Sequence, residues 1–406
     1  MKQTGIRISC LTLALLLLAA GALAGVPVNK KGAPIVEEKT SLSIFVGYHA
    51  LHGADWDSKL FTIEAEKMTN VHIDWILVPQ SSQAEKKNLL LASGDLPDVF
   101  MGALSVSDLL TYGSQGALVA LDEYFDYAPN FSALIAEQPD IYEAVVTPEG
   151  KVYSFPKIST NPNHRTSSKF YFFRNWLEQA GMEAPSTIEE YYEVLKAFKG
   201  VDFNGNGEAD EWPLANFNVE TLMGSFGLGT RGAQAHRNED IDPETGTLRY
   251  IPAADGYRQM LQFLNQLYTE GLIDPECFSA TSTTIMGKIA NNQVGAFMNI
   301  NSSWAGNDRS SWTGAKTALV GPEGYQIDAA VIPKVQTVPA YMVTAACENV
   351  EMAVRWGDFW YADPGATLYW LGVEGESFYI DENGNGRLTD WYTHNPDGLS
   401  LSEAKA

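Results

Sequence analysis

The alternation of strand-like and helix-like segments between residues 42 and 112 constrains the fold of this 406-residue chain more than any other feature. Short apolar runs of β type alternate with segments of helical spacing, with strands at 42–46, 71–78 and 98–101 and helices at 56–68, 82–93 and 106–112. Such alternation is typical of a mainly parallel sheet with crossover helices. The sequence therefore predicts an α/β fold.

A second block of elements indicates a second lobe, as the length of the chain also does, because one hydrophobic core rarely serves 406 residues. Its helices are expected at 188–198, 255–270 and 282–291, and a strand at 294–299. An extended stretch at 341–345 and a helix at 350–361 then resemble the first block. We expect lobe 1 to comprise 41–156 and 340–380, lobe 2 to comprise 157–339, and a multi-segment hinge to join them.

The N-terminus predicts export from the cytoplasm. Lys2 and Arg7 precede an apolar run that ends in small residues before Gly25, so residues 1–24 are expected to be a secretory signal peptide. A retained membrane anchor is the alternative. Residues 25–40 are rich in Gly, Pro and charge without periodicity, which predicts a flexible tether.

Charge and cysteine content exclude several classes of function. With 27 Lys and Arg against 50 Asp and Glu, the net charge of −23 would repel nucleic acid. No Cys-x-x-Cys pair is present, which argues against thiolate zinc sites. Once the signal peptide is removed, Cys277 and Cys347 remain, and either a disulfide or two free thiols is compatible with the sequence.

The expected ligand-binding residues lie beyond strand ends or are aromatic. In open α/β sheets, ligands bind at the carboxyl ends of the strands, where four residues are expected: Tyr48, His49, Phe100 and Met101. Tryptophan offers a flat apolar face with a polar edge, on which sugar rings can lie. Three tryptophans are candidates on this ground: Trp56, Trp304 and Trp370.

The segment DFNGNGEADEWP at 202–213 has the composition of a calcium loop. Oxygen side chains at alternate positions in a glycine-bent loop can surround Ca²⁺, which prefers six to eight oxygen ligands; the candidates are Asp202, Asn204, Asn206 and Asp210, with Glu211 and the carbonyl of Glu208 as further ligands. Pro213 departs from the EF-hand pattern, in which a bidentate Glu is expected at that position. The alternative is that the Asn-Gly pairs only form turns. A similar string, DENGNGRLTD at 381–390, predicts a hairpin turn.

Several segments resemble the bacterial extracellular solute-binding proteins, the family of the maltose- and alginate-oligosaccharide-binding receptors: ASGDLPDVF at 92–100, PEGKVYSFP at 148–156, NWLEQAGMEAPSTIEEYYEVLKAFK at 175–199, LYTEGLIDPE at 267–276 and GVEGESFY at 372–379. The resemblance implies a type II periplasmic-binding-protein fold with hinge segments near Phe155 and near 343–344. It also implies a calcium loop, since the family pattern matches Asp202, Asn204, Asn206, Glu208, Asp210 and Glu211.

The function that this resemblance implies is that of a monomeric receptor for an ABC-type importer. Such a receptor closes around an oligosaccharide-like ligand, delivers it to a membrane permease and performs no chemistry. Gly25 stands where similar lipoproteins carry an anchoring cysteine, and residues 381–406 read as part of a shortened C-terminal region. Two other functions stay open: a secreted polysaccharide-processing enzyme, since paired carboxylates leave no short motif, and a calcium-ordered surface interaction protein.

Overall fold

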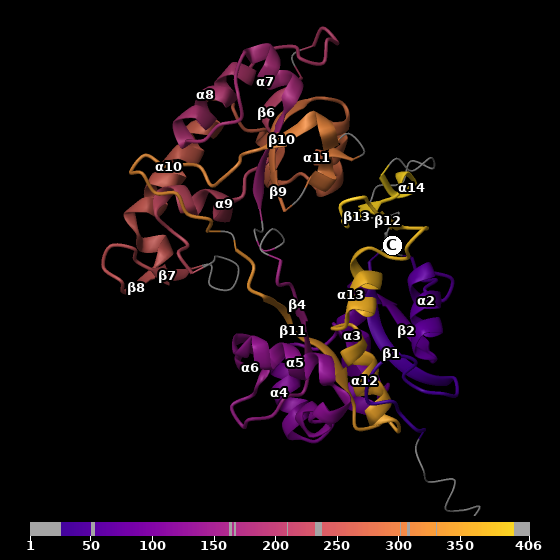
Figure 1. Ribbon diagram of the computed structural model, residues 1–406. Coiled ribbons are helices and arrows are strands. Elements are labelled where there is room, and N and C mark those ends of the chain that lie inside the picture. The colour runs from indigo at the N-terminus through magenta and orange to yellow at the C-terminus, as the bar shows by residue number, and fades with distance from the viewer. Residues whose placement is uncertain are drawn as a thin grey trace, which may run out of the picture. The chain divides into compact units, whose positions relative to one another are not determined.

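The computed structural model describes residues 26–49, 53–161, 165, 168–208, 210–231, 238–300, 302–306, 309–329 and 331–393. These form two compact units (Figure 1). Unit 1 comprises the described residues up to Lys157 together with Thr337–Tyr392, and unit 2 comprises Ile158–Gln336. No helix in the described ranges is long and apolar enough to cross a membrane. The predicted signal peptide lies outside these ranges.

Unit 1 is built on a five-stranded sheet with the order β2-β1-β3-β11-β4. Its strands are β1 (Thr40–Tyr48), β2 (Val71–Pro79), β3 (Val99–Met101), β4 (Phe155–Ile158) and β11 (Val335–Val343). The strand β1 is parallel to both β2 and β3, as the sequence predicts, whereas β11 is antiparallel to β3. The strand β1 lies between two parallel neighbours, and apolar residues on both of its faces are buried, including Ile44 and Phe45.

Helices from both ends of the chain complete unit 1, as the indigo and yellow segments of Figure 1 show. They are α2 (Leu60–Thr69), α3 (Gln80–Ser93), α4 (Val106–Ser114), the 3₁₀ helix η2 (Leu121–Tyr127), α5 (Pro129–Glu137), α6 (Pro139–Val145), α12 (Val350–Phe359) and α13 (Asp363–Trp370). The predicted helix at 56–68 begins at Leu60. Residues before it form a turn in which the Asp55 carboxylate accepts hydrogen bonds from Ser58.

Residues 26–39, which we call the N-terminal strap, are packed against unit 1. Ile35 and Val36 are fully buried. The Ile35 N–H donates to the carbonyl of Thr69 at 2.9 Å, and the Arg355 guanidinium donates to the carbonyl of Gly32 at 2.6 Å. The prediction of a flexible tether is therefore wrong for these residues, because Ile35 and Val36 anchor the segment in the core of unit 1.

Unit 2 contains a four-stranded sheet with the order β10-β5-β9-β6. Its strands are β5 (Lys169–Phe173), β6 (Trp212–Leu214), β9 (Val294–Asn299) and β10 (Trp312–Gly314). The strand β9 is parallel to β6 and antiparallel to β5. In a hairpin of β7 (Glu239–Ile241) and β8 (Leu248–Tyr250), Arg249 donates to the fully buried Asp240 carboxylate through two nitrogens, at 2.9 and 2.7 Å. Arg249 also donates to the carbonyl of Gly227 at 2.8 Å, which holds the hairpin to the rest of the unit.

The helices of unit 2 are α7 (Arg174–Ala180), α8 (Ile188–Phe198), α9 (Val219–Met223), α10 (Asp255–Thr269) and α11 (Ser282–Ala290), with 3₁₀ turns η4 (Gly224–Phe226), η5 (Ile251–Ala253), η6 (Pro275–Phe278), η7 (Ser302–Ala305) and η8 (Arg309–Ser311). The helix α8 has the predicted bounds because Thr187 caps it, accepting from the Glu190 N–H at 3.0 Å. Apolar side chains at helical spacing then bury one face of α8 in the core.

The chain passes from unit 1 to unit 2 within β4 and returns within β11, two neighbouring strands of one sheet. The second crossing lies at 336–337, seven residues before the expected hinge segment at Val343–Thr344. Val343 and Thr344 are fully buried in unit 1. The Thr344 N–H donates to the carbonyl of Asp98 at 2.9 Å, so this segment is fixed within the sheet.

The two described cysteines are both free thiols, one in each unit. Cys347 is buried, and burial together with the nearby Asp98 raises the pKa of its thiol to about 12. Cys277 is partly exposed, and burial also raises the pKa of its thiol. Of the two alternatives that the sequence leaves open, the structure has the free thiols.

Candidate functional site

The carboxyl ends of β1, β2 and β3 lie at one edge of the unit 1 sheet. Tyr48, the last residue of β1, is in register with Pro79, the last residue of β2, and Val46 is in register with Met101, the last residue of β3. Tyr48 and Met101 are half-buried and His49 is exposed. Three of the four residues expected at strand ends are therefore accessible at this edge.

Phe100 is the fourth, and the structure excludes it from a ligand surface. Its side chain is fully buried and packs edge to face against Phe45 with ring centroids 5.5 Å apart. Alternation along β3 explains the error, because successive side chains of a strand point to opposite faces. The residue belongs to the hydrophobic core of unit 1.

Gln83 is a polar residue of this edge that sequence reasoning missed. Its side-chain Nε2 donates to the carbonyl of Gly102, just beyond β3, at 3.4 Å. Its amide also lies against Gly47 of β1, so closely that a Cβ on Gly47 would come within 2.5 Å of it. Gln83 therefore bridges the ends of β1 and β3 from the first turn of α3.

The tryptophans predicted in unit 1 lie on elements outside the sheet. Trp56, in the turn before α2, is half-buried and packs edge to face against Trp75 of β2 at 5.0 Å. Its indole N–H donates to the carbonyl of Gly53 at 3.2 Å. Trp370, the last residue of α13, is 43% exposed beside the similarly exposed Tyr369. Both indoles thus retain accessible apolar surface.

In unit 2 the carboxyl end of β9 carries an aromatic cluster. Trp304, in η7 just beyond β9, is half-buried and lies 5.8 Å from the ring of Phe297. The ring of Tyr171, which is in register with Phe297 on the paired strand β5, also stacks on Phe297, with centroids 5.0 Å apart. Tyr171 was not predicted; its alternation with buried Phe170 and Phe172 along β5 is the signal that could have found it.

Basic side chains flank this cluster. Lys169, in register with Asn299 at the end of β9, donates to the carbonyl of Ile300 at 3.1 Å, and burial lowers the pKa of its ammonium. Burial likewise lowers the pKa of Arg309, whose Nε donates to the carbonyl of Gly306 at 3.2 Å. Aromatic faces next to hydrogen-bond donors form a surface suited to binding a polar ring compound.

The loop from Asp202 to Glu211 is folded around its own carboxylates. Asp202 accepts hydrogen bonds from the backbone N–H groups of Gly205, Asn206 and Gly207, at 2.7, 3.1 and 2.9 Å. Gly205 and Gly207 both have positive φ, which the bend requires. Phe203 anchors the start of the loop to the core by stacking on Trp176 at 4.3 Å. The side chain of Glu208 is exposed.

Two further carboxylates close this loop. Asp210 accepts from the side-chain amides of Asn204 and Asn206 and, outside the loop, from Gln293. The hydrogen bond from Gln293 is the largest cause that holds the pKa of Asp210 below its ordinary value. Glu211 is buried; its Oε1 accepts from the Asn204 N–H at 3.1 Å, whereas its buried Oε2 has no hydrogen-bond partner among the described residues.

A cation in this loop would depend on oxygens of several kinds. No group of three or more His, Cys, Asp or Glu side chains is placed to hold a metal ion in the part of the chain that the structure describes. Amide and main-chain oxygens would have to join the carboxylates, as they do in calcium loops. The unpaired, buried oxygen of Glu211 is the observation that fits such an ion, because a buried carboxylate oxygen normally has a partner.

The second Asn-Gly string forms the predicted hairpin, between β12 (Phe378–Ile380) and β13 (Gly386–Leu388), ahead of the short helix α14 (Asp390–Thr393). Asp381 accepts from the backbone N–H groups of Asn383 and Asn385, and its other oxygen accepts from Arg387 at 2.8 Å. Both of its carboxylate oxygens are therefore engaged, in contrast to those of Glu211.

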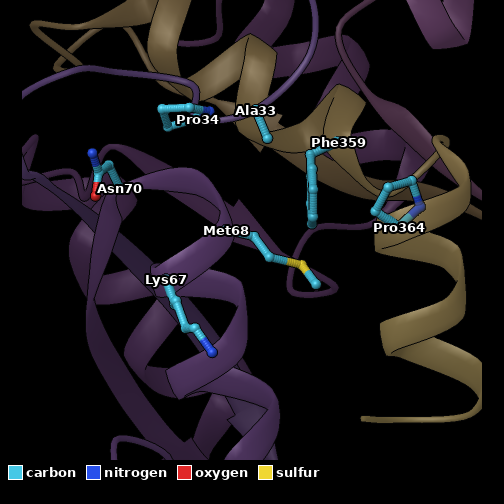
Figure 2. A pocket seen from close by; sticks show the side chains of 7 residues that line it. All are labelled: Ala33, Pro34, Lys67, Met68, Asn70, Phe359 and Pro364. Carbon is cyan, nitrogen blue, oxygen red and sulfur yellow. The ribbon is translucent and has the colours of Figure 1, made fainter. Parts of the chain in front are cut away.

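Two cavities lie within the units, away from every predicted ligand-binding residue. One, of about 380 Å³, is lined by Ala33, Pro34, Lys67, Met68, Asn70, Phe359 and Pro364. Figure 2 shows the side chains of Met68 and Phe359 extending into the space beneath the N-terminal strap. The other, of about 370 Å³, lies beside α10 in unit 2. Neither brings the strand-end residues together.

Residues 63–376 match the family model of the bacterial extracellular solute-binding proteins. The fructooligosaccharide ABC transporter substrate-binding protein FusA of Streptococcus pneumoniae is 30% identical over 349 residues, which are 80% of this chain and 62% of FusA. A polygalacturonan/rhamnogalacturonan-binding protein of Bacillus subtilis, YtcQ, is 25% identical over 280 residues, which are 68% of this chain and 53% of YtcQ. This chain thus spans less than two thirds of either relative.

Solved structures of FusA are also similar. The structure in complex with kestose has a TM-score of 0.74 and 26% identity, and the alignment covers 90% of this chain and 76% of FusA. Another FusA structure, of an EF-hand mutant in complex with fructo-nystose, has the same score and coverage.

Proposed function

Because the chain belongs to the bacterial extracellular solute-binding protein family, we propose that it is the ligand-capturing receptor of an ABC-type importer for oligosaccharides. The predicted type II periplasmic-binding-protein fold is confirmed by the similarity to FusA. The observation that carries the proposal is the similarity to a fructooligosaccharide-binding protein over 80% of the chain. Family members act outside the cytoplasm, and the N-terminal sequence supports export of this chain.

The strand-end residues of each unit support a carbohydrate ligand. Unit 1 offers Tyr48, His49 and Gln83, which can hydrogen-bond to hydroxyl groups, and unit 2 offers the aromatic faces of Trp304 and Tyr171. We propose that these residues contact the ligand and that Trp56, Met101 and Trp370 contribute apolar surface.

Calorimetric titration with a panel of neutral and acidic oligosaccharides tests this function. We expect at least one glycan to bind, and Trp304→Ala to weaken its binding by about 2 kcal/mol, or roughly thirtyfold in Kd, as for a central aromatic contact. Trp391→Ala is the matched control, because Trp391 is also a half-exposed tryptophan but lies in the C-terminal helix α14. Absence of binding across the whole panel would contradict the proposal.

The two alternative functions predict different results. A polysaccharide-processing enzyme would release shorter sugars from a glycan of the panel, whereas we expect the receptor to return its ligand unchanged. A calcium-ordered interaction protein would be stabilised by calcium and by no glycan. A fluorescence-monitored melt with each glycan, with and without calcium, separates the receptor from the interaction protein.

We propose that the loop at 202–211 holds a structural Ca²⁺, through the carboxylates of Asp202, Asp210 and Glu211, the side-chain oxygens of Asn204 and Asn206, and the carbonyl of Glu208. The buried, unpaired Oε2 of Glu211 supports this, as does the EF-hand that is mutated in the FusA structure. Bound calcium would cross-link the ends of the loop and take no part in chemistry.

Thermal unfolding tests the calcium loop. At a hundred times its Kd, calcium adds about 2.7 kcal/mol of stability, which corresponds to roughly 5–10 °C in Tm for a unit of this size. Asp202→Ala should abolish that shift. Asp381→Ala is the control, because Asp381 occupies a loop of similar sequence in which, among the described residues, no buried carboxylate oxygen lacks a partner. An equal calcium shift in the wild type and Asp202→Ala would refute the assignment.

A further inference from the structure

Gln293 lies outside the calcium loop, yet its side chain contacts the loop. Its Nε2 donates to Oδ2 of Asp210. The other carboxylate oxygen of Asp210, Oδ1, accepts from the amide groups of Asn204 and Asn206 at 3.3 and 3.2 Å. The loop's own amides thus bind Oδ1, and Gln293 binds Oδ2 from outside the loop.

The main chain of Gln293 is fixed on both sides. Its N–H donates to the carbonyl of Lys288 at 2.9 Å, which closes the C-terminal end of α11, and its carbonyl accepts from the Trp212 N–H at 2.8 Å. Trp212 directly follows Glu211 and is in register with Val294 of β9. The residue that holds Asp210 is thus supported by a helix end and by the sheet, rather than by the loop.

We propose that Gln293 is a positioning residue of the calcium loop, which holds the Asp210 carboxylate from the start of β9 in the orientation in which it binds the ion. This inference rests on the calcium loop proposed above. Partners that orient metal ligands in this way typically change the affinity for the ion ten- to hundredfold when they are removed. Without Gln293, Oδ2 of Asp210 would lose its donor, and calcium binding would have to order that side of the carboxylate.

The test is a calorimetric calcium titration of the chelator-stripped, full-length protein. Gln293→Ala and Gln293→Leu should both raise the Kd for calcium ten- to hundredfold; the leucine variant keeps the aliphatic bulk and removes only the amide. Gln259→Ala is the matched control, because Gln259 also donates to a carboxylate of unit 2, that of Glu323, at 2.9 Å, and lies on α10. Its Kd should equal that of the wild type.

A second measurement separates positioning from a general structural role. The midpoint of urea unfolding is determined for each variant in chelator and in saturating calcium. A merely structural role would lower both midpoints equally and leave the Kd unchanged, whereas the proposed role lowers the gain in midpoint that calcium produces. An unchanged or tighter Kd in both Gln293 variants would overturn the assignment.

The failures of the two proposals are distinguishable. If the wild type binds no calcium, the calcium loop is wrong and the role of Gln293 falls with it. If the wild type and both Gln293 variants bind calcium equally, the loop stands and only the positioning role is wrong.

Discussion

The substitution Ile35→Ala tests whether the N-terminal strap is part of the fold. Ile35 is fully buried, and its N–H donates to the carbonyl of Thr69. The change removes three carbons, each worth about 0.8 kcal/mol of burial, and leaves a cavity that adds to the loss, within the roughly 2–5 kcal/mol observed for such truncations. We expect a loss of about 3 kcal/mol in the free energy of unfolding of unit 1.

Urea unfolding followed by circular dichroism and by tryptophan fluorescence measures this loss. Two probes are needed because a chain of two units can unfold in two steps, and only the step of unit 1 should shift. Lys31→Ala is the control, since Lys31 is an exposed residue of the same strap and its removal should change stability by less than about 0.5 kcal/mol.

A loss below about 1 kcal/mol for Ile35→Ala would refute the reasoning. It would mean that the strap detaches in solution at little cost, as the flexible tether expected from the sequence would.

Three further predictions concern the cores of the two units. In a protein that begins at residue 26, a thiol reagent at pH 8 should modify Cys277 faster than Cys347, whose thiol has a pKa of about 12, and two thiols should react after unfolding without reductant; fewer would indicate a disulfide. Asp240→Ala should cost about 3–5 kcal/mol in urea unfolding because it removes the carboxylate that accepts from two nitrogens of the partly buried Arg249 and leaves the longer contact with Asp242 at 3.6 Å; a cost below 1 kcal/mol would contradict this. Gly295→Ala places a Cβ 2.4 Å from two core aromatic rings and should cost about 1–3 kcal/mol in the same assay, and a neutral effect would show that the rings move aside.

Local patterns in the sequence were sufficient for the elements whose signals are complete within a few residues. The strand at 294–299 and the helix at 188–198 have the predicted bounds, because an apolar run and a capped amphipathic repeat each specify their own ends. The α/β fold class and the hairpin at 381–390 follow from similarly local signals. These features depend little on which segments lie next to each other in space.

The candidate site required spatial information that the sequence lacks. Phe100 and Met101 are the last two residues of the predicted strand at 98–101, but only the sheet shows that the phenylalanine faces the core. Gln83 and Gln293 are ordinary helix and loop residues until the strands bring Gly47 and Asp210 against them. The strap was mistaken for a tether because its composition conceals two anchoring residues.

Because the strap is anchored to unit 1, a label attached at its N-terminal side would report on unit 1. Any tag or surface linker joined ahead of Val26 is attached to unit 1, through the buried residues of the strap and the Arg355 contact with Gly32. Immobilised by that route, the protein would be held through unit 1. A fluorescent pair for sensing ligand would accordingly need its second dye on unit 2.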